Sequence, residues 1–366
     1  MLGYYKMSII GTAHQAKKDG VCQDASDVLV LKNGWVVASI ADGLGSAKRS
    51  EVGSATSVKT VLSFISENYP EKWHEESLIS LLRTAYHKAL KTIKAISIEN
   101  QAELCDYDTT LTTVIYNGTN VIYGHAGDGG IITLSSYGDY SMLTEVQKGE
   151  AFNETSPLRA GPESWSFGAS KEDVCALIMM TDGIFDVAYP WLLAKTEQPI
   201  YINYVRPFMD INILKVSSPA DFENAQAEIK DFFCGQYSKQ ISDDKTIVGI
   251  INTDVTPETK PNQYYLEPDW KTLAKDHHDR LYKKKDVAPD ITKTSSKEDS
   301  SSEANAQKDK PEHITMQTSS QVDMLREKTG ESQSPDKKAA MRDIVLSSDK
   351  EPKEKPKSFL GKLFKK

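Results

Sequence analysis

Apolar residues in the first 250 positions fall alternately into short β-type runs and longer segments with helical spacing. Runs rich in β-branched residues predict strands, which we place at 8–13, 28–31, 35–40, 110–116, 121–125, 131–134, 140–143, 176–180 and 246–251. Apolar residues three and four apart predict helices at about 51–67, 75–102, 184–195 and 220–233. Asn33-Gly34 and Asn117-Gly118 separate strand-like runs, which is typical of hairpins. Hairpin strands grouped with pairs of helices predict an α+β fold with helices layered on antiparallel sheets.

Three of the predicted strands end on an aspartate that adjoins glycine. These are Asp42 before Gly43, Asp128 between two glycines, and Asp182 before Gly183. A strand end gives a carboxylate a rigid base, and glycine lets a ligand approach the backbone closely. One such acid is often an ordinary turn, but three predict a shared acidic site that binds a hard divalent cation.

Two further acids stand in loops that precede strands. Asp24 follows Gln23, and Asp243 is followed by Asp244. Carboxylates brought together repel unless a cation neutralises them. Oxygen ligands favour Mg²⁺ or Mn²⁺ over zinc. Two such ions could activate a water for in-line attack on phosphorus, so phosphate-ester hydrolysis is the chemistry that the pattern indicates.

The composition narrows the class of protein. Of 366 residues, 39% are hydrophobic, which suffices for a core, yet the mean hydropathy of −0.47 indicates that part of the chain is not packed. The net charge of −8 argues against nucleic-acid binding. The four cysteines are scattered without a Cys-x-x-Cys pair, which argues against disulfides and zinc. No signal peptide or membrane-spanning run is evident, so we expect a cytoplasmic protein.

The character of the chain changes past about residue 253. We expect a folded domain over 1–255 and a transition segment over 256–282 whose Tyr264, Tyr265 and Trp270 dock on it. Residues 283–356 are polar and lack aromatic residues, so we expect a disordered linker.

The last ten residues, 357–366, form a basic amphipathic stretch. Phe359, Leu360, Leu363 and Phe364 would share one face of a helix, with lysines around them. A membrane surface or a groove on a partner protein would suit this face. A frayed tail is the alternative, since ten residues make a marginal helix.

The ordered set of acidic motifs resembles a known family. The set comprises Gln23-Asp24, Ala41-Asp42-Gly43-Leu44-Gly45, Thr109-Thr110-Leu111, Gly127-Asp128-Gly129, Thr181-Asp182-Gly183 and Asp243-Asp244-Lys245-Thr246. In this order the motifs resemble bacterial metal-dependent protein phosphatases of the PP2C type, over about residues 8–252. The resemblance implies a four-layer α-β-β-α sandwich with a two-metal site at one end of the central sheets.

The resemblance also implies a role for each acid. Asp42 would bridge two Mg²⁺ or Mn²⁺ ions, and Gly43 would offer its carbonyl to one of them. Asp182 and Asp243 would complete the shell of the other ion, and Asp24 would orient the attacking water. Asp24 and Asp42 are thus the implied catalytic residues.

Asp128 would hold a third ion, more weakly bound than the other two. Two positions of this chain depart from the family pattern. Leu44 stands where many members carry a His, and Asp19 stands where many carry a phosphate-binding Arg. Lys17 or Lys18 would have to bind the phosphate instead, as a point charge rather than a bidentate fork.

The implied reaction is metal-dependent hydrolysis of phosphoserine or phosphothreonine on proteins. Phosphorylated proteins, with a serine/threonine kinase among them, would be the partners. Two alternatives stay open on the sequence alone. One is a catalytically weak pseudophosphatase or scaffold that binds phosphoproteins, and the other is a small-molecule phosphoesterase on the same metal site.

Overall fold

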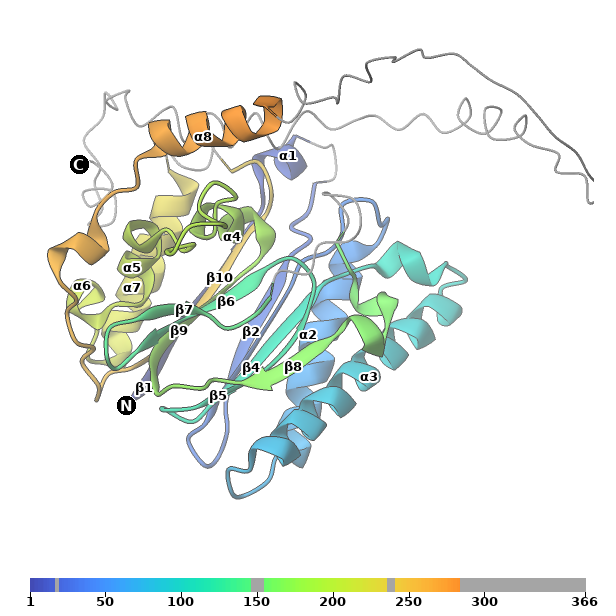
Figure 1. Cartoon of the computed structure of the whole chain (residues 1–366). Helices are drawn as coiled ribbons and strands as arrows, with labels where there is room; N and C mark the ends of the chain where they lie inside the picture. The colour runs from blue at the N-terminus through green and yellow to red at the C-terminus, as the bar shows by residue number, and fades with distance from the viewer. Residues whose placement is uncertain (17–19, 146–154, 236–240, 284–366) are drawn as a thin grey trace, which may run out of the picture.

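Two antiparallel sheets of five strands each form the centre of the molecule in the computed structural model, which describes residues 1–16, 20–145, 155–235 and 241–283 (Figure 1). One sheet has the strand order β1 (Leu2–Ile9), β10 (Lys245–Asn252), β9 (Val174–Met180), β6 (Gly130–Ser135) and β7 (Tyr140–Met142). The other has the order β2 (Ala25–Val30), β3 (Val36–Ala41), β4 (Leu111–Tyr116), β5 (Val121–Ala126) and β8 (Ser166–Ala169). Every strand pair in both sheets is antiparallel.

Helices cover the outer face of each sheet (Figure 1). The β2–β8 sheet packs against α2 (Ser50–Asn68) and α3 (Glu75–Glu99). The β1–β7 sheet packs against α4 (Asp182–Ala188), α5 (Ile202–Met209) and α7 (Pro219–Cys234), with the short α6 (Ile211–Leu214) between the last two.

Three hydrophobic cores separate these four layers. Strand β3 shows how one sequence serves two of them, because side chains alternate along a strand. Val36, Ala38 and Ile40 lie in the core between the sheets, whereas Val37 and Ala41 lie in the core below α2 and α3. The predicted α+β fold and the four-layer α-β-β-α sandwich are confirmed.

Predicted elements differ from the structure in three places. The helix expected at 184–195 is α4, which begins at Asp182 and ends at Ala188. The first strand was expected at 8–13 but is β1, which pairs with β10 over its whole length; its polar residues alternate with the buried Tyr5 and Met7, so no continuous apolar run marks it. No strand was predicted at residues 166–169, which form β8, a four-residue edge strand that exists because it pairs with β5.

The residues after β10 contact β7 and the helices that cover its sheet. The Tyr140 amide donates to the Tyr264 hydroxyl (3.0 Å), within a segment that includes the 3₁₀ turn η5 (Asn262–Tyr265). Helix α8 (Trp270–Lys283) follows, and the Trp270 ring lies 5.1 Å from that of Tyr201. No helix in the described residues is long and apolar enough to span a membrane. The predicted linker and the amphipathic stretch with Phe359 lie outside the described residues.

Candidate active site

Three of the predicted acids meet at one edge of the sandwich. Asp42 follows β3, Asp128 lies in the turn between β5 and β6, and Asp182 begins α4, separated from the end of β9 by one residue. Each offers a carboxylate oxygen, and these oxygens all lie within 4.8 Å of one another. Carboxylates alone make up this group, which is the donor set of Mg²⁺ or Mn²⁺ rather than of zinc. The residues present therefore fit a hard divalent cation.

Threonines hold the backbone of the Asp42 loop in place. The Asp42 amide donates to the Thr110 hydroxyl (2.8 Å), and the Asp42 carbonyl accepts from the Thr110 amide (2.8 Å) and the Thr109 hydroxyl (2.9 Å). Gly43 lies against neighbouring backbone, since a Cβ there would come within 2.7 Å of the Gln23 carbonyl oxygen. Only glycine fits this close approach without a shift of the chain.

The carboxylates destabilise one another when no cation is present. Burial raises the pKa of Asp42 well above its usual range, and the charges of neighbouring aspartates, first Asp182 and then Asp24, add to the effect. Burial likewise raises the pKa of Asp24 to about 8, with Asp244 and Asp182 contributing. A bound divalent cation would reverse this balance, because it stabilises the ionised form of each carboxylate.

Asp24 reaches the site from the loop before β2. It is 8% exposed, and its Oδ2 accepts a hydrogen bond from the Thr181 hydroxyl (2.8 Å). Thr181 is the residue before Asp182, so this bond holds the Asp24 carboxylate next to the start of α4.

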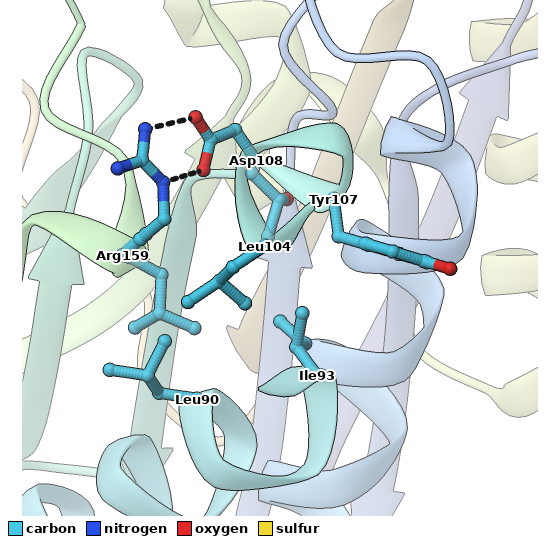
Figure 2. Close-up of a pocket in the computed structure, with 8 residues that line it drawn as sticks. Leu90, Ile93, Leu104, Tyr107, Asp108 and Arg159 are labelled. Carbon is cyan, nitrogen blue, oxygen red and sulfur yellow. Dashed lines mark hydrogen bonds and ion pairs between the residues drawn. The ribbon is translucent and has the colours of Figure 1, made fainter. Parts of the chain in front are cut away.

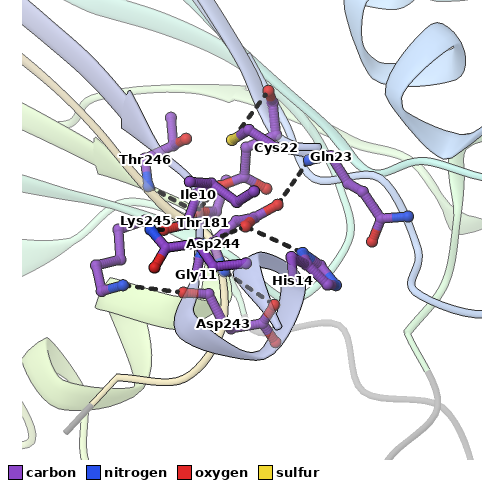
Figure 3. Close-up of polar contacts among 12 residues, drawn as sticks. Ile10, Gly11, His14, Cys22, Gln23, Thr181, Asp243, Asp244, Lys245 and Thr246 are labelled. Carbon is purple, nitrogen blue, oxygen red and sulfur yellow. Dashed lines mark hydrogen bonds and ion pairs between the residues drawn. The ribbon is translucent and has the colours of Figure 1, made fainter. Parts of the chain in front are cut away.

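The two adjacent aspartates before β10 have different surroundings (Figure 3). Asp244 is 2% exposed; its Oδ1 accepts from the Gly11 amide (2.6 Å) and its Oδ2 from the Gln23 amide (2.6 Å). His14 Nδ1 lies 3.0 Å from Asp244 Oδ1. Asp244 thus joins the N-terminal loop to β10.

Asp243 stands outside the group of three close carboxylates, but it is near enough for its charge to raise the pKa of Asp42. The buried Lys245 holds the Asp243 backbone, since its ammonium donates to the Asp243 carbonyl (3.3 Å). Lys17 and Lys18, the predicted phosphate-binding residues, lie outside the described residues.

Two side chains near the site were missed in the sequence. The Thr155 hydroxyl donates to Asp128 Oδ2 (2.5 Å), which ties the residues after the 146–154 segment to the acidic group. Arg159 forms two parallel hydrogen bonds with Asp108, from Nε (2.6 Å) and Nη2 (2.7 Å) (Figure 2). No local signal identifies either pair, because the partners are 27 and 51 residues apart.

Comparison with known proteins identifies the family of this chain. The family description protein phosphatase 2C matches residues 10–232, more than half of the chain. The chain belongs to the protein phosphatase 2C family and is a phosphatase by that membership. No curated protein matches the sequence.

Solved structures of similar fold are distant in sequence. A bacterial serine phosphatase is 13% identical, with a TM-score of 0.50, over 71% of this chain and 100% of its own. That likeness shows the fold. Stp1 from Staphylococcus aureus (13% identity, 69% and 95% coverage, TM-score 0.46) is also similar. The catalytic domain of the serine/threonine phosphatase PstP in complex with two manganese ions is similar as well (15% identity, 68% of this chain and 97% of its own, TM-score 0.46).

Proposed function

We propose that this protein hydrolyses phosphoserine and phosphothreonine on proteins, with two Mg²⁺ or Mn²⁺ ions held by its aspartates. The observation that carries the proposal is the group Asp42, Asp128 and Asp182, whose oxygens lie within 4.8 Å in a chain of the protein phosphatase 2C family. The partners would be phosphorylated proteins in the cytoplasm, with a serine/threonine kinase among them.

The residues divide into ligands and supports. Asp42 would be the central ligand, since burial and neighbouring charge both disfavour its carboxylate in the absence of a cation. In the described part of the chain the Gly43 carbonyl accepts no backbone hydrogen bond, which leaves it available as a ligand. Asp182 and Asp243 would hold the second ion, and Asp128 would hold a third, weaker one.

The bound ions would supply an activated water and neutralise the charge that develops on the phosphoryl group. Asp24 orients that water and accepts its proton; the hydrogen bond from Thr181 fixes the direction of its carboxylate. Lys17 or Lys18 binds the phosphate of the substrate. Thr109 and Thr110 keep the Asp42 backbone in place, so the ligand geometry is set before the substrate arrives.

The test is turnover of a phosphothreonine peptide with and without Mn²⁺, by wild type, Asp42→Asn and Asp182→Asn. Asp173→Asn is the matched control, because Asp173 is exposed and away from the acidic group. We expect Mn²⁺-dependent turnover that falls at least about a hundredfold in the two site variants, since metal ions contribute several kcal/mol to such reactions. The control should keep wild-type turnover.

Absence of turnover by folded, Mn²⁺-loaded wild type, on the peptide and on p-nitrophenyl phosphate, would reject the proposal in favour of a scaffold. Turnover of p-nitrophenyl phosphate alone would indicate a small-molecule phosphoesterase.

A further inference from the structure

Helix α3 carries a run of positive charge that opposes the sign of the whole chain. Residues 77–98 contain no Asp or Glu, although the chain has a net charge of −8. The same residues include five basic side chains, all exposed: Arg83, His87, Lys88, Lys91 and Lys94.

Four of these side chains lie on one face of the helix. Arg83, His87, Lys91 and Lys94 are spaced by four, four and three residues, which places them one above the other on a helix. We call these four residues the α3 basic stripe. From first to last they span about 17 Å, at a rise of about 1.5 Å per residue.

Contacts place the first two members of the α3 basic stripe beside β8 and the residue before it. The Arg83 guanidinium lies 4.9 Å from the centre of the Phe167 ring, and Phe167 belongs to β8. The His87 ring lies 5.0 Å from the ring of Trp165, the residue before β8. Lys88, by contrast, is about 100° further around the helix than His87.

The ring contacts of Arg83 and His87 position these two side chains but supply no negative charge to the stripe. Within the described residues, no member of the α3 basic stripe is within ion-pair distance of a carboxylate. Lys91 and Lys94 are three residues apart, and cations at this spacing destabilise a helix. The helix dipole favours cations only in the last turn, and Lys94 precedes the final residue, Glu99, by five positions. An anionic partner would offset this repulsion.

The loop beside the α3 basic stripe leads to the acidic site. The Trp165 indole donates to the Leu158 carbonyl (3.0 Å), and the Leu158 amide donates to the Thr109 carbonyl (2.8 Å). Thr109 in turn donates to the Asp42 carbonyl. Arg159, 42% exposed in its side chain, lies across a small pocket from Leu90 and Ile93 of α3 (Figure 2). Arg159 itself is paired with Asp108, so the link from the helix to the site is the loop and not a continuous row of charge.

We propose that the α3 basic stripe binds an acidic segment of the phosphoprotein substrate; this rests on the proposed function. A single row of about 17 Å matches about five residues of extended chain. A membrane would require a broad basic surface rather than a single row of side chains. Charges at the rim of such a site set selectivity among substrates.

The test compares two phosphothreonine peptides, one with five Asp or Glu residues beside the phosphothreonine and one with Gln at those positions. The acidic peptide is made in two versions, one with the acidic run before the phosphothreonine and one with the run after it. The variant is Lys91→Gln/Lys94→Gln, and the matched control is Lys59→Gln/Lys88→Gln, which removes the same charge from exposed positions off the stripe.

We expect wild type to prefer the acidic peptide at low salt, through KM. The stripe variant should lose about fivefold in kcat/KM on that peptide only, because two exposed charge pairs are lost. The control variant, and turnover of p-nitrophenyl phosphate by both variants, should be unchanged.

Equal turnover of the two peptides by wild type, or an equal loss in both variants, would overturn the proposal. Binding of anionic vesicles that the stripe variant loses, without any peptide preference, would overturn it in favour of a membrane. If wild type turns over nothing, the proposed function fails, and the stripe is judged by fluorescence anisotropy with the acidic peptide. The proposal would then be supported if the stripe variant binds the acidic peptide more weakly than wild type and the control variant binds it as wild type does. Equal binding by wild type and the stripe variant would overturn the proposal.

Discussion

The substitution Asp244→Asn tests whether Asp244 has a structural role while the adjacent Asp243 binds metal. The two carboxylate oxygens of Asp244 accept hydrogen bonds from the Gly11 and Gln23 amides, each at 2.6 Å. Asparagine has the same shape but a single acceptor oxygen. One of the two amides would therefore lose its acceptor and face an NH₂ donor in a place that is 2% exposed.

The size of the effect follows from these contacts. A hydrogen bond to a charged acceptor contributes about 1.5–3 kcal/mol, and a buried donor left unpaired costs about 1–3 kcal/mol. Because the two terms overlap, we expect the free energy of unfolding to fall by about 2–4 kcal/mol. With a urea m value of about 2–3 kcal/mol/M, the unfolding midpoint should fall by about 1 M.

The assay is urea unfolding followed by tryptophan fluorescence, in a chelator so that no metal contributes. Asp243→Asn is the matched control, since it removes a charge that raises the pKa of Asp42. The control should keep or raise the midpoint and lower Mn²⁺-dependent turnover. An unchanged midpoint for Asp244→Asn, together with lost turnover, would refute the reasoning and make Asp244 a metal ligand.

Two further predictions concern the helix layers. In Gly53→Ala the new Cβ would come within 2.1 Å of the Tyr107 carbonyl oxygen, so α2 must shift. We expect the free energy of unfolding to fall by about 1–3 kcal/mol, and the melting temperature in calorimetry to fall by about 3–10 °C. An unchanged melting temperature would contradict this prediction, because it would show that α2 shifts without a loss of stability. Asp221 caps α7, and hydrogen bonds, first from the Ser217 amide, lower its pKa to about 2. A lowered pKa stabilises the fold above about pH 4 and ceases to do so as the pH falls towards 2. The gap in urea midpoint between wild type and Asp221→Asn should therefore be full at pH 7 and narrow below pH 4, and a constant gap would contradict this.

The sequence by itself predicted the features that depend on residues close together in the chain. An apolar run followed by Asp and Gly is a local pattern, and it identified Asp42, Asp128 and Asp182, which the structure brings within 4.8 Å. The ordered motifs predicted the four-layer sandwich through family resemblance. Helix α3 was expected at 75–102 and ends at Glu99, where its apolar spacing ends.

Only the tertiary structure decided the features that depend on distant residues. Nothing local separates Asp243 from Asp244, because their difference comes from Gly11 and Gln23, more than 200 residues away. Strand β8 has four residues, too few for a pattern, and it forms because β5 offers an edge. The charges of α3 can be read from the chain, but the elements beside them cannot. Local spacing sets which face of a helix or strand is apolar, whereas packing between layers sets which side chains meet.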